Sequence, residues 1–140
     1  YVGIIVDRLH VHDDMVRLAW RLAADRMVLV SDAMAGLGLP AGAAELAGSR
    51  VRLDGVSARL ADGTLAGSVI SLRDAVANLR AVTDCDVEAA IRAASRAPSR
   101  AIRDDSRGEL AVGKRADMVV VDHRFSVVAT IIGGNVVYRS

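Results

Sequence analysis

The chain has 140 residues, of which 52% are hydrophobic and 25% charged, a composition typical of a globular domain and unlike that of a disordered segment. Its 18 basic and 17 acidic residues leave a formal charge of +1, which argues against the strongly basic surfaces that bind nucleic acids or membranes. No apolar run reaches the roughly 18–20 residues needed to cross a bilayer, and Cys85 is the single cysteine. These features favour a protein of the reducing cytoplasm.

The first 30 residues predict a parallel α/β unit. Val2–Val6 and Met27–Val30 are continuous apolar runs, typical of strands that are buried on both faces of a parallel sheet. Between them, apolar residues recur at helical spacing after Asp13 and Asp14, which are suited to cap a helix. Because the first strand begins at the second residue with no methionine before it, we expect the chain to be part of a longer protein.

The middle of the chain predicts a loop, a hairpin and two helices. Ala33–Gly48 is rich in glycine and alanine and is expected to form no regular element. Residues 50–60 alternate apolar and polar side chains around Asp54-Gly55, which is a strong hairpin signal. Apolar stripes then predict one helix that begins at about Ser68–Val69 and another over residues 87–94.

The last third of the chain has the character of a small antiparallel sheet. Residues 118–121 form an apolar run, and residues 127–132 are expected to pair with residues 136–138 across Gly133-Gly134-Asn135. We therefore expect a boundary near Asp104–Gly108, which separates residues 1–105 from residues 106–140.

Four blocks, taken in chain order, carry a resemblance to a known family. They are Asp7-Arg8-Leu9-His10-Val11, Leu29-Val30-Ser31-Asp32-Ala33, Thr64-Leu65-Ala66-Gly67-Ser68 and Gly113-Lys114-Arg115-Ala116-Asp117. Their order and spacing resemble the C-terminal part of the N-acetylglucosamine-6-phosphate deacetylases, which belong to the amidohydrolase superfamily. The resemblance implies an α/β fold, with the C-terminal part of a metal-dependent (β/α)8 TIM barrel over residues 1–105 and strands of a small β-sandwich over residues 106–140.

Asp32 is the expected catalytic residue. The resemblance implies that this aspartate is the general base that accepts a proton from the attacking water and the general acid that returns it to the departing amine. Its place after an apolar strand agrees with the rule that barrel enzymes keep their chemistry at the C-terminal ends of the strands. The alternative is an aspartate that caps the turn at the end of a strand.

Two further blocks are expected to bind the substrate. The resemblance implies that His10 contacts a sugar phosphate and that Asp7, Arg8 and Leu9 line the same wall. It implies the same role for a second set, Leu65, Ala66 and Gly67. A glycine there would let a ligand approach the backbone closely, whereas the alternative is a plain turn in which Ser68 is a helix N-cap.

No metal ligand is assigned to this chain. His10 and His12 form a His-x-His pair, which marks metal ligands in amidohydrolases, but the one remaining histidine is His123, far along the sequence. His12 also stands where the family commonly has an acidic residue. The resemblance implies a divalent metal ion, zinc or similar, in the complete enzyme, held by a glutamate and two histidines that this chain does not contain.

The resulting expectation is an amide hydrolase of amino-sugar metabolism. It would convert N-acetylglucosamine 6-phosphate into glucosamine 6-phosphate and acetate as part of a longer chain, while these 140 residues alone would be inactive. A homo-oligomer, or association with the missing N-terminal half, is the expected assembly. The alternatives are another amidohydrolase that acts on an amide, in which Asp32 keeps its role, and a non-catalytic fragment or interaction module.

Overall fold

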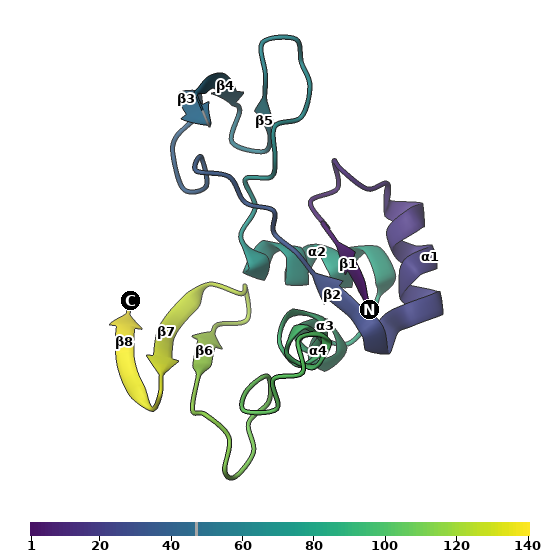
Figure 1. Ribbon diagram of the computed structural model, residues 1–140, viewed down its shortest axis with the longest axis vertical. Helices are drawn as coiled ribbons and strands as arrows, with labels where there is room; N and C mark the ends of the chain where they lie inside the picture. The colour runs from purple at the N-terminus through teal and green to yellow at the C-terminus, as the bar shows by residue number, and fades with distance from the viewer. Residues whose placement is uncertain (47) are drawn as a thin grey trace.

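The computed structural model describes residues 1–46 and 48–140. Figure 1 shows three groups of elements: a parallel strand pair packed with helices, and two separate three-stranded antiparallel sheets. In chain order the elements are β1 (Val2–Ile4), α1 (Asp13–Ala23), the 3₁₀ helix η1 (Ala24–Arg26), β2 (Met27–Leu29), β3 (Gly42–Leu46), β4 (Ser49–Leu53), β5 (Ala58–Arg59), α2 (Leu72–Thr83), α3 (Val87–Ala94), α4 (Arg96–Ala101), β6 (Met118–Val121), β7 (Val127–Ile132) and β8 (Asn135–Arg139).

The β1–α1–β2 unit confirms the predicted parallel strand pair. Ile4 lies opposite Leu29 in a parallel register. Both strands are shorter than predicted, because regular pairing ends soon after these residues: the N–H of Val30 still donates to the Ile4 carbonyl at 3.0 Å. Beyond that bond the two segments separate into the loops that follow β1 and β2.

The main hydrophobic core lies between this strand pair and helices α1, α2 and α3. Met27 of β2 and Leu79 of α2 are fully buried in it, together with Val16 of α1 and Ala90 of α3. Burial of a large aliphatic side chain contributes about 1.5–3 kcal/mol to folding, so this cluster holds the helices on the strand pair. No helix in the described ranges is long and apolar enough to span a membrane.

The predicted start of helix α2 at Ser68–Val69 was wrong, because the helix begins at Leu72. The N-cap is Ser71, whose side chain accepts from the N–H of Asp74, while the Asp74 carboxylate accepts from the N–H of Ser71. This reciprocal capping box satisfies two backbone donors at the first turn. Residues 68–70 are therefore left outside the helix.

The second group is an antiparallel sheet of β3, β4 and β5. The prediction that Ala33–Gly48 has no regular element was wrong, because Gly42–Leu46 pairs with β4 over five residues; residue 47 lies outside the described part. The predicted hairpin is confirmed by the pairing of Leu53 with Ala58. Backbone N–H groups of Ser57 and Val56 donate to Asp54 in its turn and lower the pKa of that carboxyl to about 2.

The third group, β6, β7 and β8, confirms the antiparallel sheet expected in the last third. The β7–β8 turn is formed by Gly133 and Gly134, and Ile132 pairs with Asn135. The Gly133 N–H donates to the Asp117 carboxylate at 2.8 Å, and this bond lowers the pKa of Asp117. In Figure 1 this sheet stands apart from the β3–β5 sheet and lies to one side of helices α3 and α4.

Gly108 lies in the segment that connects helix α4 to strand β6. Its φ of +89° is in the left-handed region, which favours glycine. A Cβ at this position would lie 2.5 Å from the Ser99 Oγ and 2.8 Å from the Ser99 Cβ. The close approach of Gly108 to α4 thus requires a residue without a side chain.

We predict that Gly108→Ala destabilises the protein more than Gly113→Ala. The two glycines have nearly the same φ, +89° and +85°, but a Cβ at Gly113 would meet no atom within 4 Å in the described structure. The difference in the free energy of unfolding, measured by urea denaturation, should be about 1–3 kcal/mol because only Gly108→Ala creates a steric overlap. Equal destabilisation by both variants would contradict the close contact with Ser99.

Candidate functional site

The candidate site lies at the carboxyl ends of β1 and β2. Because the two strands are parallel and in register, the segments that follow them leave the sheet at the same edge. Asp7 to His10 follow β1, and Asp32 follows β2. The polar residues predicted from two separate blocks therefore emerge at one edge, where parallel α/β sheets place their ligands.

Asp32 is tied through its backbone to the segment 65–68. The Ser68 N–H donates to the Asp32 carbonyl at 3.0 Å, and the Met34 N–H donates to the Ser68 carbonyl at 2.9 Å. The φ of Asp32 is +48°, a left-handed conformation that aspartate tolerates better than most residues. The Asp32 residue is exposed, and within residues 1–46 and 48–140 its carboxylate has no hydrogen-bond partner.

The segment that contains Leu65, Ala66 and Gly67 is the return from the β3–β5 sheet. Leu65 forms a bridge with Arg59, and the Ala66 N–H donates to the Ala58 carbonyl at 2.8 Å. Gly67 has a φ of +92°, and a Cβ on it would lie 3.5 Å from the Asp32 carbonyl oxygen. The structure thus brings Gly67 next to Asp32, which the sequence did not indicate.

Ser68 has a different role from the N-cap considered as an alternative. It is 1% exposed, and its Oγ accepts from the N–H of Ile70 at 3.0 Å. Helix α2 starts only at Leu72, after its own cap. Ser68 instead closes the turn that holds the segment 65–68 against the end of β2.

Asp7 and His10 form the most tightly bonded pair of the site. The Asp7 Oδ1 accepts from the N–H of Leu9 at 3.0 Å and from the N–H of His10 at 2.9 Å. The Asp7 Oδ2 lies 2.6 Å from the His10 Nδ1. Burial raises the pKa of Asp7, but the hydrogen bonds from His10 and Leu9 outweigh it, so that the pKa lies below its ordinary value.

Arg8 and Leu9 separate Asp7 from His10 in the sequence. Both residues are exposed, and Arg8 has a left-handed backbone with a φ of +65°. The Arg8 Nη2 donates to the Asp13 Oδ2 at 2.7 Å. This ion pair ties the loop to the first turn of α1.

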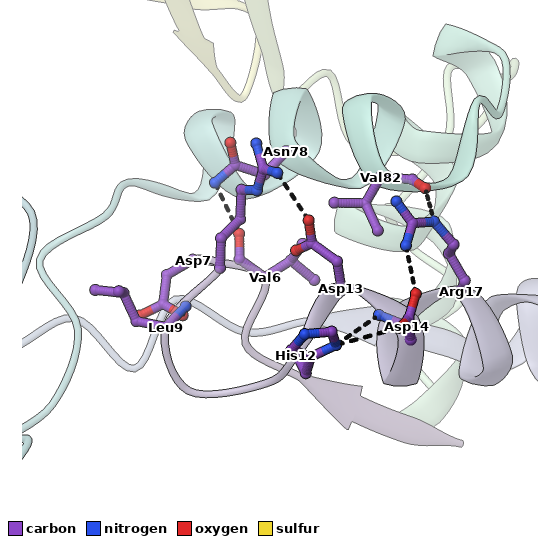
Figure 2. Close-up of polar contacts among 10 residues, drawn as sticks. Val6, Asp7, Leu9, His12, Asp13, Asp14, Arg17, Asn78 and Val82 are labelled. Atoms are coloured by element: carbon purple, nitrogen blue, oxygen red, sulfur yellow. Dashed lines mark hydrogen bonds and ion pairs between the residues drawn. The ribbon is translucent and has the colours of Figure 1, made fainter.

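Asn78 of helix α2 was not identified from the sequence. Its Nδ2 donates to the carbonyl of Val6 at 2.9 Å, directly before Asp7, as Figure 2 shows. Val6 is fully buried, so its carbonyl depends on this amide. The available signal in the sequence was an amide residue at helical spacing from Ala75 and Val82, which are both buried.

His12 caps helix α1, a role that the sequence assigned to Asp13 and Asp14. The His12 Nδ1 accepts from the N–H of Asp14 at 3.2 Å, and the two aspartates occupy the first turn (Figure 2). In the part of the chain that the structure describes, no group of three or more histidine, cysteine, aspartate or glutamate side chains could hold a metal ion.

Comparison with known proteins identifies the family. The sequence profile of the Amidohydrolase family matches residues 4–137. The chain belongs to the amidohydrolase family. An N-acetylglucosamine-6-phosphate deacetylase from Lysinibacillus sphaericus is 35% identical over 134 residues, 95% of this chain and 35% of the relative. Its counterpart from Caenorhabditis elegans is 37% identical, over 99% of this chain and 34% of the relative.

Solved structures agree with this family membership. An N-acetylglucosamine-6-phosphate deacetylase from Thermotoga maritima superposes with a TM-score of 0.91 and 37% identity, over 99% of this chain and 38% of the other. The enzyme from Pasteurella multocida gives a TM-score of 0.94 at 28% identity, over 100% of this chain and 37% of the other. These amidohydrolases confirm the expected fold class, whereas this chain spans about 35% of the length of its curated relatives.

We predict that Asn78→Ala lowers the free energy of unfolding by about 1–3 kcal/mol, the usual cost of a buried polar group without a partner. The substitution removes the donor to the buried Val6 carbonyl. Asn135→Ala is the control, because Asn135 is exposed and its amide lies 3.4 Å from the Gly133 carbonyl oxygen; it should change stability by less than about 0.5 kcal/mol. Equal urea midpoints for the two variants would contradict the role of Asn78.

Proposed function

We propose that this chain is the C-terminal portion of an N-acetylglucosamine-6-phosphate deacetylase, which releases acetate and leaves glucosamine 6-phosphate. Relatives of this name match nearly the whole chain at 35% and 37% identity. The observation that best supports the proposal is the pair of backbone hydrogen bonds between Ser68 and the segment at Asp32 and Met34. They join the proposed catalytic residue to the proposed substrate-binding block.

Asp32 is the general base and acid of the proposed reaction. An exposed carboxylate without a competing partner in the described chain is suited to take a proton from the attacking water and deliver it to the departing amine. Its backbone carbonyl is held by Ser68 at 3.0 Å, which fixes the Cα from which the side chain projects. The strand-end cap reading is less favoured, since the Asp32 carboxylate accepts no backbone N–H in the described residues.

The substrate wall has two sides. One is formed by His10 and the segment Asp7–Leu9 that leads to it, and the other by Leu65, Ala66 and Gly67. The imidazole of His10 is suited to bind a hydroxyl or phosphate oxygen. An N-acetyl-D-glucosamine-6-phosphate deacetylase mutant from Mycobacterium smegmatis, 30% identical to this chain, was solved in complex with N-acetyl-D-glucosamine-6-phosphate.

The complete enzyme also needs groups from outside these residues. We place a divalent metal ion, zinc or similar, on ligands elsewhere in the longer protein, where it would activate the water for attack. The boundary near Asp104–Gly108, a cytoplasmic location, and a homo-oligomer or a contact with an N-terminal half belong to the same proposal. The pair of histidines His10 and His12 is not assigned to the metal, because the described residues place no third histidine, cysteine, aspartate or glutamate with them in a group that could hold a metal ion.

We predict that Asp32→Asn in the complete enzyme lowers kcat by about 10²–10⁴ and changes KM little, because an amide retains the size of the side chain but cannot carry the proton. Turnover of N-acetylglucosamine 6-phosphate is measured by the release of acetate. Asp105→Asn is the control, since Asp105 is an exposed aspartate after helix α4. A near-normal kcat for Asp32→Asn would show that this residue is only a strand-end cap.

A second prediction concerns the 140-residue chain by itself. With added zinc it should show no turnover, because the described residues hold no group of metal ligands and so cannot activate water in this way. The longer protein that contains the chain should be active under the same conditions. Metal-dependent release of acetate by the short chain would contradict the assignment of the ligands to other parts of the enzyme.

A further inference from the structure

Asp7 is too enclosed to be a direct contact of the substrate. The residue is 6% exposed and its side chain only 1%. Both carboxylate oxygens are already used, Oδ1 by the N–H groups of Leu9 and His10 and Oδ2 by the His10 Nδ1. A carboxylate with three donors has little capacity left for a further partner.

His10 is different, because its ring reaches the surface. The side chain is 21% exposed. Its Nδ1 lies 2.6 Å from the Asp7 Oδ2, slightly shorter than the roughly 2.7–2.9 Å of charge-assisted hydrogen bonds between a nitrogen and a carboxylate. Since an ionised carboxylate only accepts, the Nδ1 must carry the proton. The Nε2, which has no hydrogen-bond partner in residues 1–46 and 48–140, is then the ring atom available to a ligand.

We propose that Asp7 is a positioning residue that acts through His10. It holds the imidazole in one orientation and one pattern of protonation, so that the Nε2 faces the substrate. The proposal rests on the proposed function, in which His10 contacts the sugar phosphate. It changes the role of Asp7, which the family resemblance had placed on the substrate wall itself.

The geometry of the turn supports this division of roles. The same carboxylate that orients the ring also binds two backbone N–H groups of the turn, so ring and backbone are held as one unit. The lowered pKa of Asp7 is consistent with an ionised carboxylate. A carboxylate that bonds one ring nitrogen orients the imidazole of functional histidines in many active sites.

The chain contains a matched pair for comparison. His12 and Asp14 have the same side-chain types, with a distance of 3.6 Å between the His12 Nδ1 and the Asp14 Oδ2, but both side chains are more than 70% exposed, at 77% and 73%. Asp14→Asn therefore removes a carboxylate near a histidine without altering the proposed site. Any effect that depends on the buried pair should be absent from this variant.

The test combines kinetics of the complete enzyme with ¹⁵N NMR of the histidine rings. Asp7→Asn retains an oxygen that can accept the two backbone N–H groups but removes the carboxylate that accepts from the Nδ1. We expect KM for N-acetylglucosamine 6-phosphate to rise by about 10-fold, with kcat changed less than about 3-fold, as expected when a binding contact is misplaced. Asp14→Asn should change neither constant.

A double-substitution cycle separates positioning from a structural role. In a His10→Asn background, Asp7→Asn should raise KM by less than about 2-fold, because its effect passes through the histidine. Additive effects on KM would overturn the proposal. So would an unchanged KM in Asp7→Asn.

The NMR spectrum gives a test that needs no variant to fold. In the wild-type enzyme the His10 ring should carry a proton on Nδ1, and a neutral ring protonated only on Nε2 would overturn the proposal. Failure of the proposed function is distinguishable, because the wild-type enzyme would then not release acetate from this substrate. If the wild-type enzyme releases acetate but the effects of Asp7→Asn and His10→Asn on KM are additive, the positioning role alone is overturned.

Discussion

The in-register parallel pairing of β1 with β2 is the interaction on which the candidate site depends. Ile4 lies opposite Leu29, and the Val30 N–H extends the pairing by one hydrogen bond. A slip of one residue would turn the buried side chains to the wrong face, which the fully buried Met27 opposes. The same register determines that the loops after the two strands start at one edge. The relative position of Asp7 and Asp32 is therefore set by backbone pairing and core packing before any functional side chain contributes.

The return of the chain to this edge after the β3–β5 sheet is the second constraint. A long insertion costs little extra entropy once its ends are held together, and Ser68 holds them through bonds to Asp32 and Met34. Gly67 satisfies the left-handed backbone next to that contact. The β3–β5 sheet and the candidate site are thereby coupled, because the segment 65–68 that ends this excursion of the chain is also the proposed substrate-binding block.

The sequence predicted the elements whose pattern is local. The β1–α1–β2 unit, the hairpin at Asp54 and the strands after residue 117 were recognised from apolar periodicity and turn residues, and the structure confirms them. The sequence could not predict β3, whose Gly42, Ala43 and Ala44 form a strand only because β4 pairs with them. The start of α2 was misplaced because Ser68 and Ser71 are both possible N-caps, and the partner Asp74 makes Ser71 the cap that is used.

For the site, residue types were easier to predict than their bonds. The blocks at Asp7–His10, Asp32 and Leu65–Gly67 were selected from the sequence, and their roles stay predictions. The bond between Ser68 and Asp32, and the amide of Asn78 at the Val6 carbonyl, join residues distant in the chain. Contacts of this kind arise from tertiary packing and have no local pattern in the sequence.

Two aspartates follow adjacent strands, yet their surroundings suit them to different tasks. Asp7 is buried, and its two oxygens accept three hydrogen bonds. A group that transfers protons must exchange partners during the reaction, and a carboxylate held this way would have to give up bonds that stabilise the loop. Asp32 is exposed, and the hydrogen bond that positions it in the described structure goes from the Ser68 N–H to its backbone carbonyl, which leaves its side chain unengaged. The buried aspartate is thus suited to orient a neighbour, and the exposed one to react.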